Sequence, residues 1–142
     1  MPTLTKSQLA SRLRVSVARL ARRLRQEGSR EDATPSQLTT LATLYRDGPM
    51  TLGELAEAER VRPPSMTKIV AALVERGLVR REVSKEDARV VHVEATAKGR
   101  AEHEEYQKRR EAWLNHRLAE LTPEERALLA EAVEILDRMG DQ

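Results

Sequence analysis

Residues 61–96 read VRPPSMTKIVAALVERGLVRREVSKEDARVVHVEAT, and the spacing of the apolar side chains changes once along them. In the first part the apolar residues recur every three or four positions, which predicts a helix from about Pro63 to Arg76. The inward face of this helix is Met66, Ile69, Val70 and Leu73. Gly77 follows at the position where a left-handed glycine commonly ends a helix. The segment therefore begins with one amphipathic helix that has a defined end.

The pattern beyond Gly77 is that of β-structure. Residues 78–83 are typical of a strand, and residues 90–95 alternate between apolar and polar side chains. Residues 84–89 between them are polar and have no period. This arrangement predicts two strands joined by a charged turn, which is a β-hairpin.

Helix starts elsewhere in the chain are marked by capping boxes, in which a threonine precedes Gln or Glu by three residues. The four boxes are Thr5–Gln8, Thr34–Gln37, Thr51–Glu54 and Thr122–Glu125. Pro35 and Pro123 occupy first helical positions, where a missing N–H is harmless. The apolar stripes that follow the first three caps are Leu9–Leu13–Val17–Leu20–Leu24, Leu38–Leu41–Leu44 and Leu52–Leu55–Ala56.

Two further helices follow the hairpin. Thr96 caps one that runs from about Ala97 to Ala119, and the last runs from about Pro123 to Met139. The predicted fold class is thus mostly α with a small β-hairpin. A short helix, a turn, a second helix and a hairpin follow in the order of a winged helix-turn-helix.

The distribution of charge along the chain is more informative about possible partners than the net charge of +2. Bases exceed acids in residues 1–30 and 60–89, and acids exceed bases from residue 100 onward. Taken alone, this pattern favours solvated charge on helix surfaces. The outward face of the Pro63–Arg76 helix, however, carries small and polar residues, which suit the major groove of DNA. These residues are Pro64, Ser65, Thr67, Lys68, Ala71 and Ala72.

Two stretches carry a family resemblance. Val61–Val70 together with Leu73–Arg81 looks like the recognition helix and first wing strand of the MarR (multiple-antibiotic-resistance regulator) family of transcription factors. The wing signature of that family resembles Asp87-x-Arg89-x-Val91-x-Val93-x-Ala95-Thr96-x-x-Gly99. The sequence departs from the family at Ala95, a packing position where Leu is usual. The flanking helices also follow the family's order and lengths, so the resemblance covers nearly the whole chain.

The resemblance implies a homodimer whose dimerisation region is residues 1–30 and 97–142 and whose winged DNA-binding region is residues 31–96. Two winged regions would reach successive major grooves of a pseudo-palindromic operator, with half-sites on the order of 10 bp apart. Arg89 would enter the minor groove, where Asp87 would hold it by an ion pair. The expected function is that of a sequence-specific transcriptional repressor that binds double-stranded DNA.

The candidate DNA-binding residues are Thr51, Arg62, Pro64, Ser65, Thr67, Lys68, Arg81, Lys85, Asp87 and Arg89. Contacts to bases and contacts to phosphates remain alternatives for the polar residues of the helix. Thr51 is expected to act first as a helix cap. We expect only one of Arg80 and Arg81 to face DNA, because neighbouring strand residues point to opposite faces.

The resemblance also implies a small aromatic effector that releases DNA, and Tyr45 or Trp113 would line its pocket. A role in the core or in the dimer interface is the alternative for both. The basic face of the first helix also has two explanations. Arg12, Arg19, Arg22 and Arg23 would pair with the acidic final helices across the dimer, or would attract DNA.

Several other functions are excluded or disfavoured. The chain has no cysteine, which excludes disulfides, thiolate nucleophiles and zinc fingers. Ser65-x-x-Lys68 matches a serine-acylase motif, but the accompanying motifs are missing. We expect His92, His103 and His116 on the surface, since their spacing does not suit metal binding. The sequence therefore predicts no enzymatic activity, no cofactor and no metal. The rival function is a winged helix that binds another protein.

The predicted location is the cytoplasm. The longest apolar run, Ile69–Val74, is too short to span a membrane, and the first residues lack the apolar core of a secretory signal.

Overall fold

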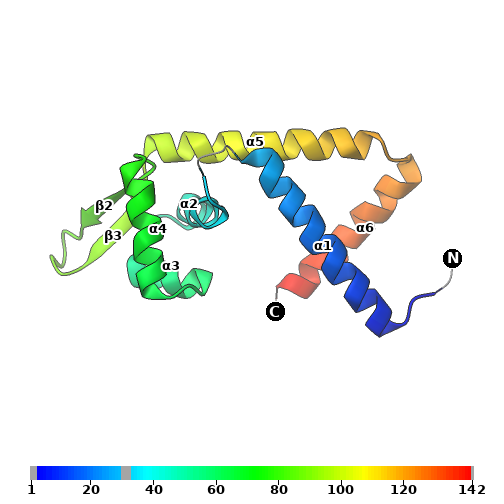
Figure 1. Ribbon diagram of the computed structural model, residues 1–142, viewed down its shortest axis with the longest axis horizontal. Helices are drawn as coiled ribbons and strands as arrows, with labels where there is room; N and C mark the ends of the chain where they lie inside the picture. Colours follow the sequence, from blue (N-terminus) through cyan, green and yellow to red (C-terminus); the bar gives the residue numbers. More distant parts are fainter. Residues whose placement is uncertain (1–2, 30–32, 142) are drawn as a thin grey trace. The chain divides into compact units, whose positions relative to one another are not determined.

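The computed structural model describes residues 3–29 and 33–141 of the 142-residue chain. Its elements follow the order expected of a winged helix-turn-helix, so the predicted fold class is confirmed. They are α1 (Lys6–Gly28), α2 (Pro35–Asp47), β1 (Met50–Thr51), α3 (Leu52–Glu59), α4 (Pro63–Glu75), β2 (Val79–Val83), β3 (Val91–Ala95), α5 (Ala97–Ala119) and α6 (Pro123–Gly140) (Figure 1).

The chain forms two compact units, which we call the helical unit and the winged unit. The helical unit consists of Met1–Glu27 and Arg109–Gln142, and the winged unit is Gly28–Lys108. Helix α5 contributes to both. The assignment of residues 1–30 and 97–142 to dimerisation, and of residues 31–96 to DNA binding, remains a prediction.

The core of the winged unit is built from the apolar faces of three short helices and the sheet. Leu55 of α3 and Met66, Val70 and Leu73 of α4 are fully buried. Each such side chain contributes roughly 1.5–3 kcal/mol when it leaves water. The predicted inward face of α4 is therefore confirmed, with Ile69 half-buried at its edge.

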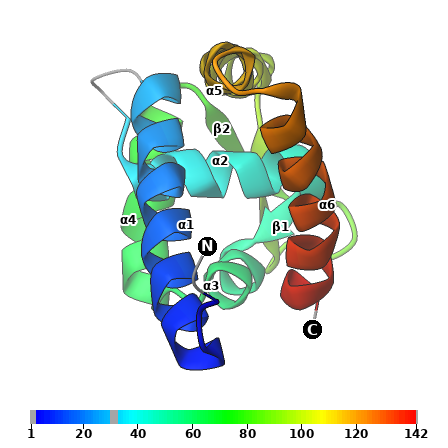
Figure 2. The ribbon, with the colours of Figure 1, turned by 90° about the vertical axis from the view of Figure 1, so that its right-hand side faces the viewer.

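The sheet has one strand more than the sequence predicts. Its order is β1–β3–β2, with both pairings antiparallel. The hairpin register places Val79 opposite Ala95 and Val83 opposite Val91. The additional strand, β1, is only Met50–Thr51 and leads directly into α3 (Figure 2). Two residues are too few to show an alternation, so no sequence pattern marks this strand.

Three of the four predicted capping boxes are complete. The threonine hydroxyl accepts the third amide of the helix, and the Glu or Gln side chain accepts the threonine amide, at Thr5, Thr51 and Thr122. The prediction of the fourth box is correct for Thr34 and wrong for Gln37. Thr34 accepts the Gln37 amide at 3.2 Å, but the Gln37 side chain accepts from Arg76 Nη1 at 3.3 Å. Gln37 therefore links α2 to the end of α4 instead of closing its own cap.

Helix α4 ends in a Schellman motif around Gly77, as the sequence predicts. The Leu78 amide donates to the Leu73 carbonyl at 3.0 Å, and the Gly77 amide donates to the Val74 carbonyl at 2.9 Å. Gly77 has φ 73°, a left-handed conformation that costs glycine little. The Thr96 hydroxyl donates to the Gly77 carbonyl and accepts the Gly99 amide, so Thr96 caps α5 as predicted and also fixes this turn.

The turn between α3 and α4 holds an unexpected left-handed residue. Arg60 has φ 54° and is the only non-glycine residue with positive φ among the described residues. Its amide donates to the Glu57 carbonyl at 3.2 Å. The conformation costs a non-glycine residue about 1 kcal/mol or more. Packing of the surrounding core offsets this cost. Because that packing is tertiary, no local sequence pattern predicts the left-handed conformation of Arg60.

A half-buried carboxylate lies just before this turn. Thr40 of α2 donates to Glu59 Oε2 at 2.8 Å, whereas Glu59 Oε1 is buried and accepts no hydrogen bond from the described residues. Burial raises the pKa of Glu59, although the hydrogen bond from Thr40 opposes the shift. Since the protonated form is favoured in the fold, the stabilising contribution of Glu59 is present at low pH and is lost as pH rises through the folded pKa.

Replacing Glu59 with glutamine is therefore expected to stabilise the winged unit at neutral pH, by up to about 1 kcal/mol. The amide retains an acceptor for Thr40 and carries no charge. Thermal unfolding measured at pH 7.5 and pH 4 checks this. The melting temperature of the variant should exceed that of the unaltered chain at pH 7.5, and the difference should shrink at pH 4. An equal difference at both pH values would contradict a burial cost.

The helical unit leaves many of its large apolar side chains exposed to water. None of the described residues of α6 is buried, and its large apolar side chains are 40–65% exposed. In α1, Leu9, Val17 and Leu20 are about half exposed. These two unpartnered stripes contrast with the closed core of the winged unit.

Candidate nucleic-acid interface

The predicted outward face of α4 is open to solvent. Pro64, Ser65, Thr67 and Lys68 are all exposed, as is Ala71, whereas Ala72 is half-buried. Within the part of the chain that the structure describes, the side chains of Ser65 and Lys68 make no hydrogen bond or ion pair. A hydroxyl and an ammonium group are therefore available on a helix face with small neighbours.

Thr67 differs from Ser65 in its remaining hydrogen-bonding capacity. Its hydroxyl donates to the Pro63 carbonyl at 3.0 Å, one turn back along α4. The hydroxyl hydrogen is thus engaged, and the oxygen remains an acceptor. The Thr67 oxygen can accept a hydrogen bond from the amino group of a base, and the Thr67 methyl group can pack against a thymine methyl. A phosphate oxygen would require a hydrogen-bond donor, which Thr67 no longer offers.

The first turn of α4 is poor in amide donors. Pro63 and Pro64 occupy its first two positions and have no N–H, and the Met66 amide donates to the Arg62 carbonyl. Of this turn, Ser65 alone has an amide that donates to no acceptor among the described residues. Arg62 is the N-cap residue, and its side chain makes no capping bond. Anion binding at this end of α4 must therefore come from side chains more than from the helix terminus.

Thr51 is engaged as a cap, as expected. Its hydroxyl accepts the Glu54 amide at 3.1 Å, and its own amide donates to Glu54 Oε1 at 3.5 Å. The residue is half-buried at the start of α3 and in β1.

The tip of the β2–β3 hairpin is a tightly bonded turn that the sequence reasoning described only as polar. The Ser84 hydroxyl accepts the amides of Glu86 and Asp87, and the Ser84 amide donates to the Val90 carbonyl at 2.8 Å. The spacing of Ser84 and Asp87 is a signal that sequence reasoning did not use, since a serine hydroxyl commonly organises such turns.

Arg89 is held at this tip by Asp87. The guanidinium donates from Nε to Oδ1 at 3.1 Å and from Nη2 to Oδ2 at 3.2 Å, and the Arg89 amide also donates to Oδ1 at 3.0 Å. These hydrogen bonds lower the pKa of Asp87, so its carboxylate stays charged at neutral pH. The Arg89 side chain is nevertheless 90% exposed. The pair thus forms a fixed guanidinium that projects from the hairpin.

The two neighbouring arginines of β2 differ in their ion-pair partners, while the question of which one faces DNA stays a prediction. Arg80 pairs with Glu94 of β3 and lies 3.9 Å from Glu82. Arg81 and Lys85 are exposed and pair with no carboxylate among the described residues. In Figure 1 the hairpin lies beside α4 and its tip projects away from the helices. Among the described residues, the hairpin cations available to a ligand are thus Arg81 in the middle of β2, Lys85 in the turn and the clamped Arg89.

One histidine prediction is wrong. His103 is 6% exposed, and its ring lies 4.4 Å from the ring of Tyr45. The reason is helical spacing, since Gly99, His103 and Tyr106 form the one buried face of α5. His116 is exposed as expected, and His92 is half-buried in β3. The described residues contain no group of three or more His, Cys, Asp or Glu side chains that could hold a metal ion.

The two predicted effector contacts lie in different units. Tyr45 of α2 donates from its hydroxyl to Glu104 Oε1 at 3.0 Å, and this bond raises the pKa of Tyr45. Trp113 of α5 lies in the helical unit, where the guanidiniums of Arg23 and Arg117 are 5.6 Å and 5.9 Å from its ring centre. A hollow of about 450 Å³ opens beside it. Its lining is Ser16, Arg19, Leu20, Arg23, Trp113 and Arg117.

The membrane expectation can also be compared with the structure. Among the described residues, no helix combines the length and the apolar character that crossing a membrane requires.

Comparisons with known proteins give one consistent result. The family model described as "MarR family" matches residues 33–91. An uncharacterized HTH-type (helix-turn-helix) transcriptional regulator of Mycobacterium leprae is 39% identical over 136 residues, which cover 96% of this chain and 95% of the relative. The HTH-type transcriptional repressor MdtR of Bacillus subtilis is 30% identical over 122 residues, covering 83% of this chain and 79% of the relative.

The fold comparison agrees. The crystal structure of a putative transcriptional regulator from Pseudomonas aeruginosa superposes with a TM-score of 0.86 at 34% identity, and the match covers 99% of both chains. The likeness therefore extends over both units of the chain.

Proposed function

The chain belongs to the MarR family of DNA-binding transcriptional regulators, not to a family of enzymes, and from this premise we propose that it is a repressor that binds a pseudo-palindromic operator as a homodimer. The observation that carries the proposal is the wing tip, where Asp87 fixes an exposed Arg89, in the same unit as the open polar face of α4. The name of MdtR supports the choice of repressor over activator.

The two DNA-reading elements have separate tasks in this proposal. Helix α4 enters the major groove, where Ser65, Thr67 and Lys68 face the base edges. Arg89 enters the adjacent minor groove, whose narrow stretches attract guanidinium groups. Arg62, Arg81 and Lys85 contact phosphates.

Three further residues complete the proposed interface. Pro64 packs against the groove wall, Thr51 lies near a phosphate at the start of α3, and Asp87 orients Arg89 without touching DNA. Phosphate contacts supply most of the affinity, and base contacts supply the sequence preference.

The exposed stripes of α1 and α6 support the homodimer. A chain does not leave two apolar helix faces in water without cost, and a second copy offers the same faces for mutual burial. Dimerisation would place two winged units on successive major grooves, with half-sites about 10 bp apart.

We also propose that a small aromatic effector lowers operator affinity. It would do so by favouring a dimer whose two α4 helices have the wrong spacing for DNA. The predicted contact remains either Tyr45 or Trp113, which lie in different units. A titration of the operator complex with benzoate and related aromatic acids tests this part separately.

Removing the wing arginine is the direct test of DNA binding. Arg89→Ala is expected to weaken binding to an operator, selected from genomic fragments, by roughly 1–3 kcal/mol, or about 5- to 150-fold. The melting temperature should stay the same, because this side chain is almost fully exposed. Fluorescence anisotropy against a labelled operator, repeated at several salt concentrations, measures both the affinity and the number of phosphate contacts.

The matched control for this test is Arg80→Ala, which removes an arginine from the same hairpin whose charge Glu94 and Glu82 already offset. It should change operator affinity much less than Arg89→Ala. Equal losses would refute the assignment of Arg89, and DNA binding insensitive to salt would refute the proposed function.

A further inference from the structure

Helix α1 carries a large excess of positive charge, and none of the proposed DNA contacts uses a residue of this helix. Helix α1 has seven basic residues against one acid, Glu27, which Arg23 pairs at 2.7 Å. Helix α6 has five acidic residues against two arginines. These charges are opposite in sign and lie on the two helices whose apolar stripes are exposed.

On α1 the charges are not evenly spread around the helix. With about 3.6 residues per turn, Arg12 and Arg19 lie directly along one edge of the stripe formed by Leu9, Leu13 and Leu20. Arg22 lies on the opposite face. Neither Arg12 nor Arg19 has an ion-pair partner within the described residues. The edge of the stripe therefore presents two free guanidiniums seven residues apart.

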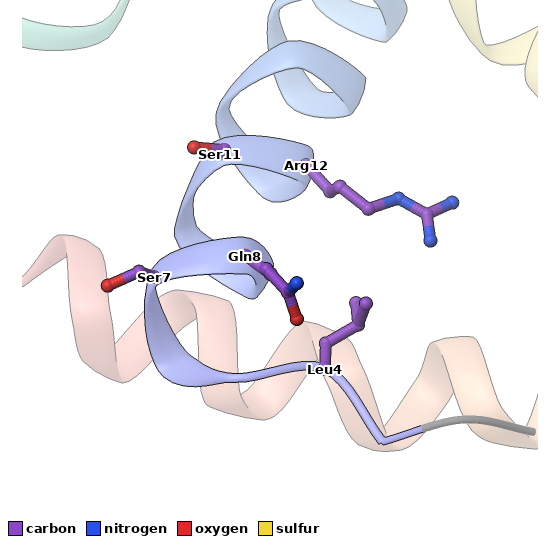
Figure 3. A pocket seen from close by; sticks show the side chains of 5 residues that line it. All are labelled: Leu4, Ser7, Gln8, Ser11 and Arg12. Atoms are coloured by element: carbon purple, nitrogen blue, oxygen red, sulfur yellow. The ribbon is translucent and has the colours of Figure 1, made fainter.

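A surface hollow lies at the N-terminal end of this edge. A hollow of about 440 Å³ is lined by Leu4, Ser7, Gln8, Ser11 and Arg12. Figure 3 shows the Arg12 side chain extending away from α1 on the same side as Leu4 and Gln8, with its guanidinium free at the end. A charged group that approaches this edge would meet the guanidinium before the helix backbone.

Helix α6 has a matching edge. Leu128, Ile135 and Met139 form one side of its apolar face. Glu124 and Glu131 lie along that side, also seven residues apart. Neither carboxylate has a partner among the described residues. Glu125, by contrast, is engaged in the cap of α6.

We infer that Arg12 and Arg19 of α1 form ion pairs with Glu124 and Glu131 in α6 of a second copy of this chain, so that these charges select and align the dimer. The equal spacing of the two pairs and their equal position beside an exposed apolar stripe carry this inference. It rests on the homodimer proposed above and decides between the two roles open to the arginines of α1, in favour of dimer pairing over attraction of DNA.

The pairs should act on specificity and alignment as well as on affinity. Ion pairs near the surface each add little to affinity, while like charges at the same places repel. In a twofold dimer each pair occurs twice, so four pairs are lost together when one edge is reversed.

The test reverses one edge at a time and follows the dimer by sedimentation equilibrium on the full chain. Arg12→Glu with Arg19→Glu is expected to raise the dimer dissociation constant at least tenfold in 50 mM salt, and the gap should narrow in 500 mM salt as the charges are screened. Glu124→Arg with Glu131→Arg should weaken the dimer similarly. Combining all four substitutions should restore dimerisation, whichever way the two helices run.

Arg22→Glu with Arg25→Glu is the control, because it makes the same charge change on α1 away from this edge. It should leave the dissociation constant within about twofold of that of the unaltered chain. Restoration by the fourfold variant, which a merely structural defect would not produce, supports the pairing.

Four results would overturn the inference. Equal weakening by the control would mean that total charge matters and not the edge. A dimer of unchanged strength that binds every DNA sequence less well would assign Arg12 and Arg19 to attraction of DNA. An unaltered chain that remains monomeric at all concentrations would remove the homodimer itself, whereas a stable dimer insensitive to all variants would remove only the pairing.

Discussion

Replacing Gly99 with alanine is expected to lower the free energy of unfolding of the winged unit by about 3 kcal/mol or more. A Cβ at this position would lie 2.0 Å from the carbonyl oxygen of Leu78 and 3.2 Å from Leu41 Cδ1. The oxygen cannot move aside cheaply, because it also accepts the Thr96 amide at 3.0 Å. The start of α5 would have to separate from Leu78, which is fully buried in the core.

Differential scanning calorimetry checks this expectation. A loss of this size should lower the melting temperature by about 10–20 °C in a domain of this length. The control is Gly53→Ala in α3, where the nearest atom to the new Cβ is Thr51 Oγ1 at 3.9 Å. That change should be neutral or stabilise the helix by up to about 1 kcal/mol. A Gly99→Ala chain that melts with the unaltered one would mean that α5 does not approach Leu78 this closely.

Gly99 also shows how a sequence pattern and its physical cause differ. The resemblance to the wing signature singled out this glycine, but no local rule demands one at the third position of a helix. The close approach to Leu78 gives the reason, and it involves two residues 21 positions apart in the sequence. A family pattern therefore reported a tertiary constraint that helix propensity alone would count against.

Local signals predicted most of the elements. Caps at Thr51 and Thr122 and the glycine stop at Gly77 depend on residues within one or two turns, and all three occur as expected. The features that were missed depend on partners far along the chain. Strand β1 exists because β3 is next to it, and Gln37 leaves its cap because Arg76 lies beside it.

The same distinction applies to the candidate interface. The exposure of Ser65 and Lys68 follows from the helical period, which the sequence contains. The bidentate bond between Asp87 and Arg89 lies in a turn of a few residues and agrees with what the resemblance implied. The engagement of the Thr67 hydroxyl with Pro63 and the burial of His103 against Tyr45 required coordinates. Whether each polar residue contacts a base or a phosphate depends on the DNA, so these roles remain proposals.

Ending the chain after Ala119 is expected to abolish the dimer and to lower affinity for a full operator by about 100- to 10,000-fold. The truncation removes α6 and with it the exposed stripe of Leu128, Leu129, Val133 and Leu136. A dimer that holds one half-site presents its second winged unit at a millimolar effective concentration, and a monomer loses that advantage. The winged unit itself should remain folded, because it is Gly28–Lys108 and contains no part of α6.

Three measurements separate these effects. Sedimentation velocity reports the dimer, near-ultraviolet circular dichroism or amide exchange reports the fold of the winged unit, and titration reports operator affinity. A chain that ends at Gly140 is the control, since it keeps all of α6 and should behave like the unaltered protein. The truncated monomer should still bind a single half-site, with the same sequence preference at the positions that α4 and Arg89 contact. This outcome would show that reading DNA belongs to the winged unit and that spacing two half-sites belongs to the helices. A truncated chain that stays dimeric at micromolar concentration, or that binds the full operator as tightly as before, would contradict the role given to α6.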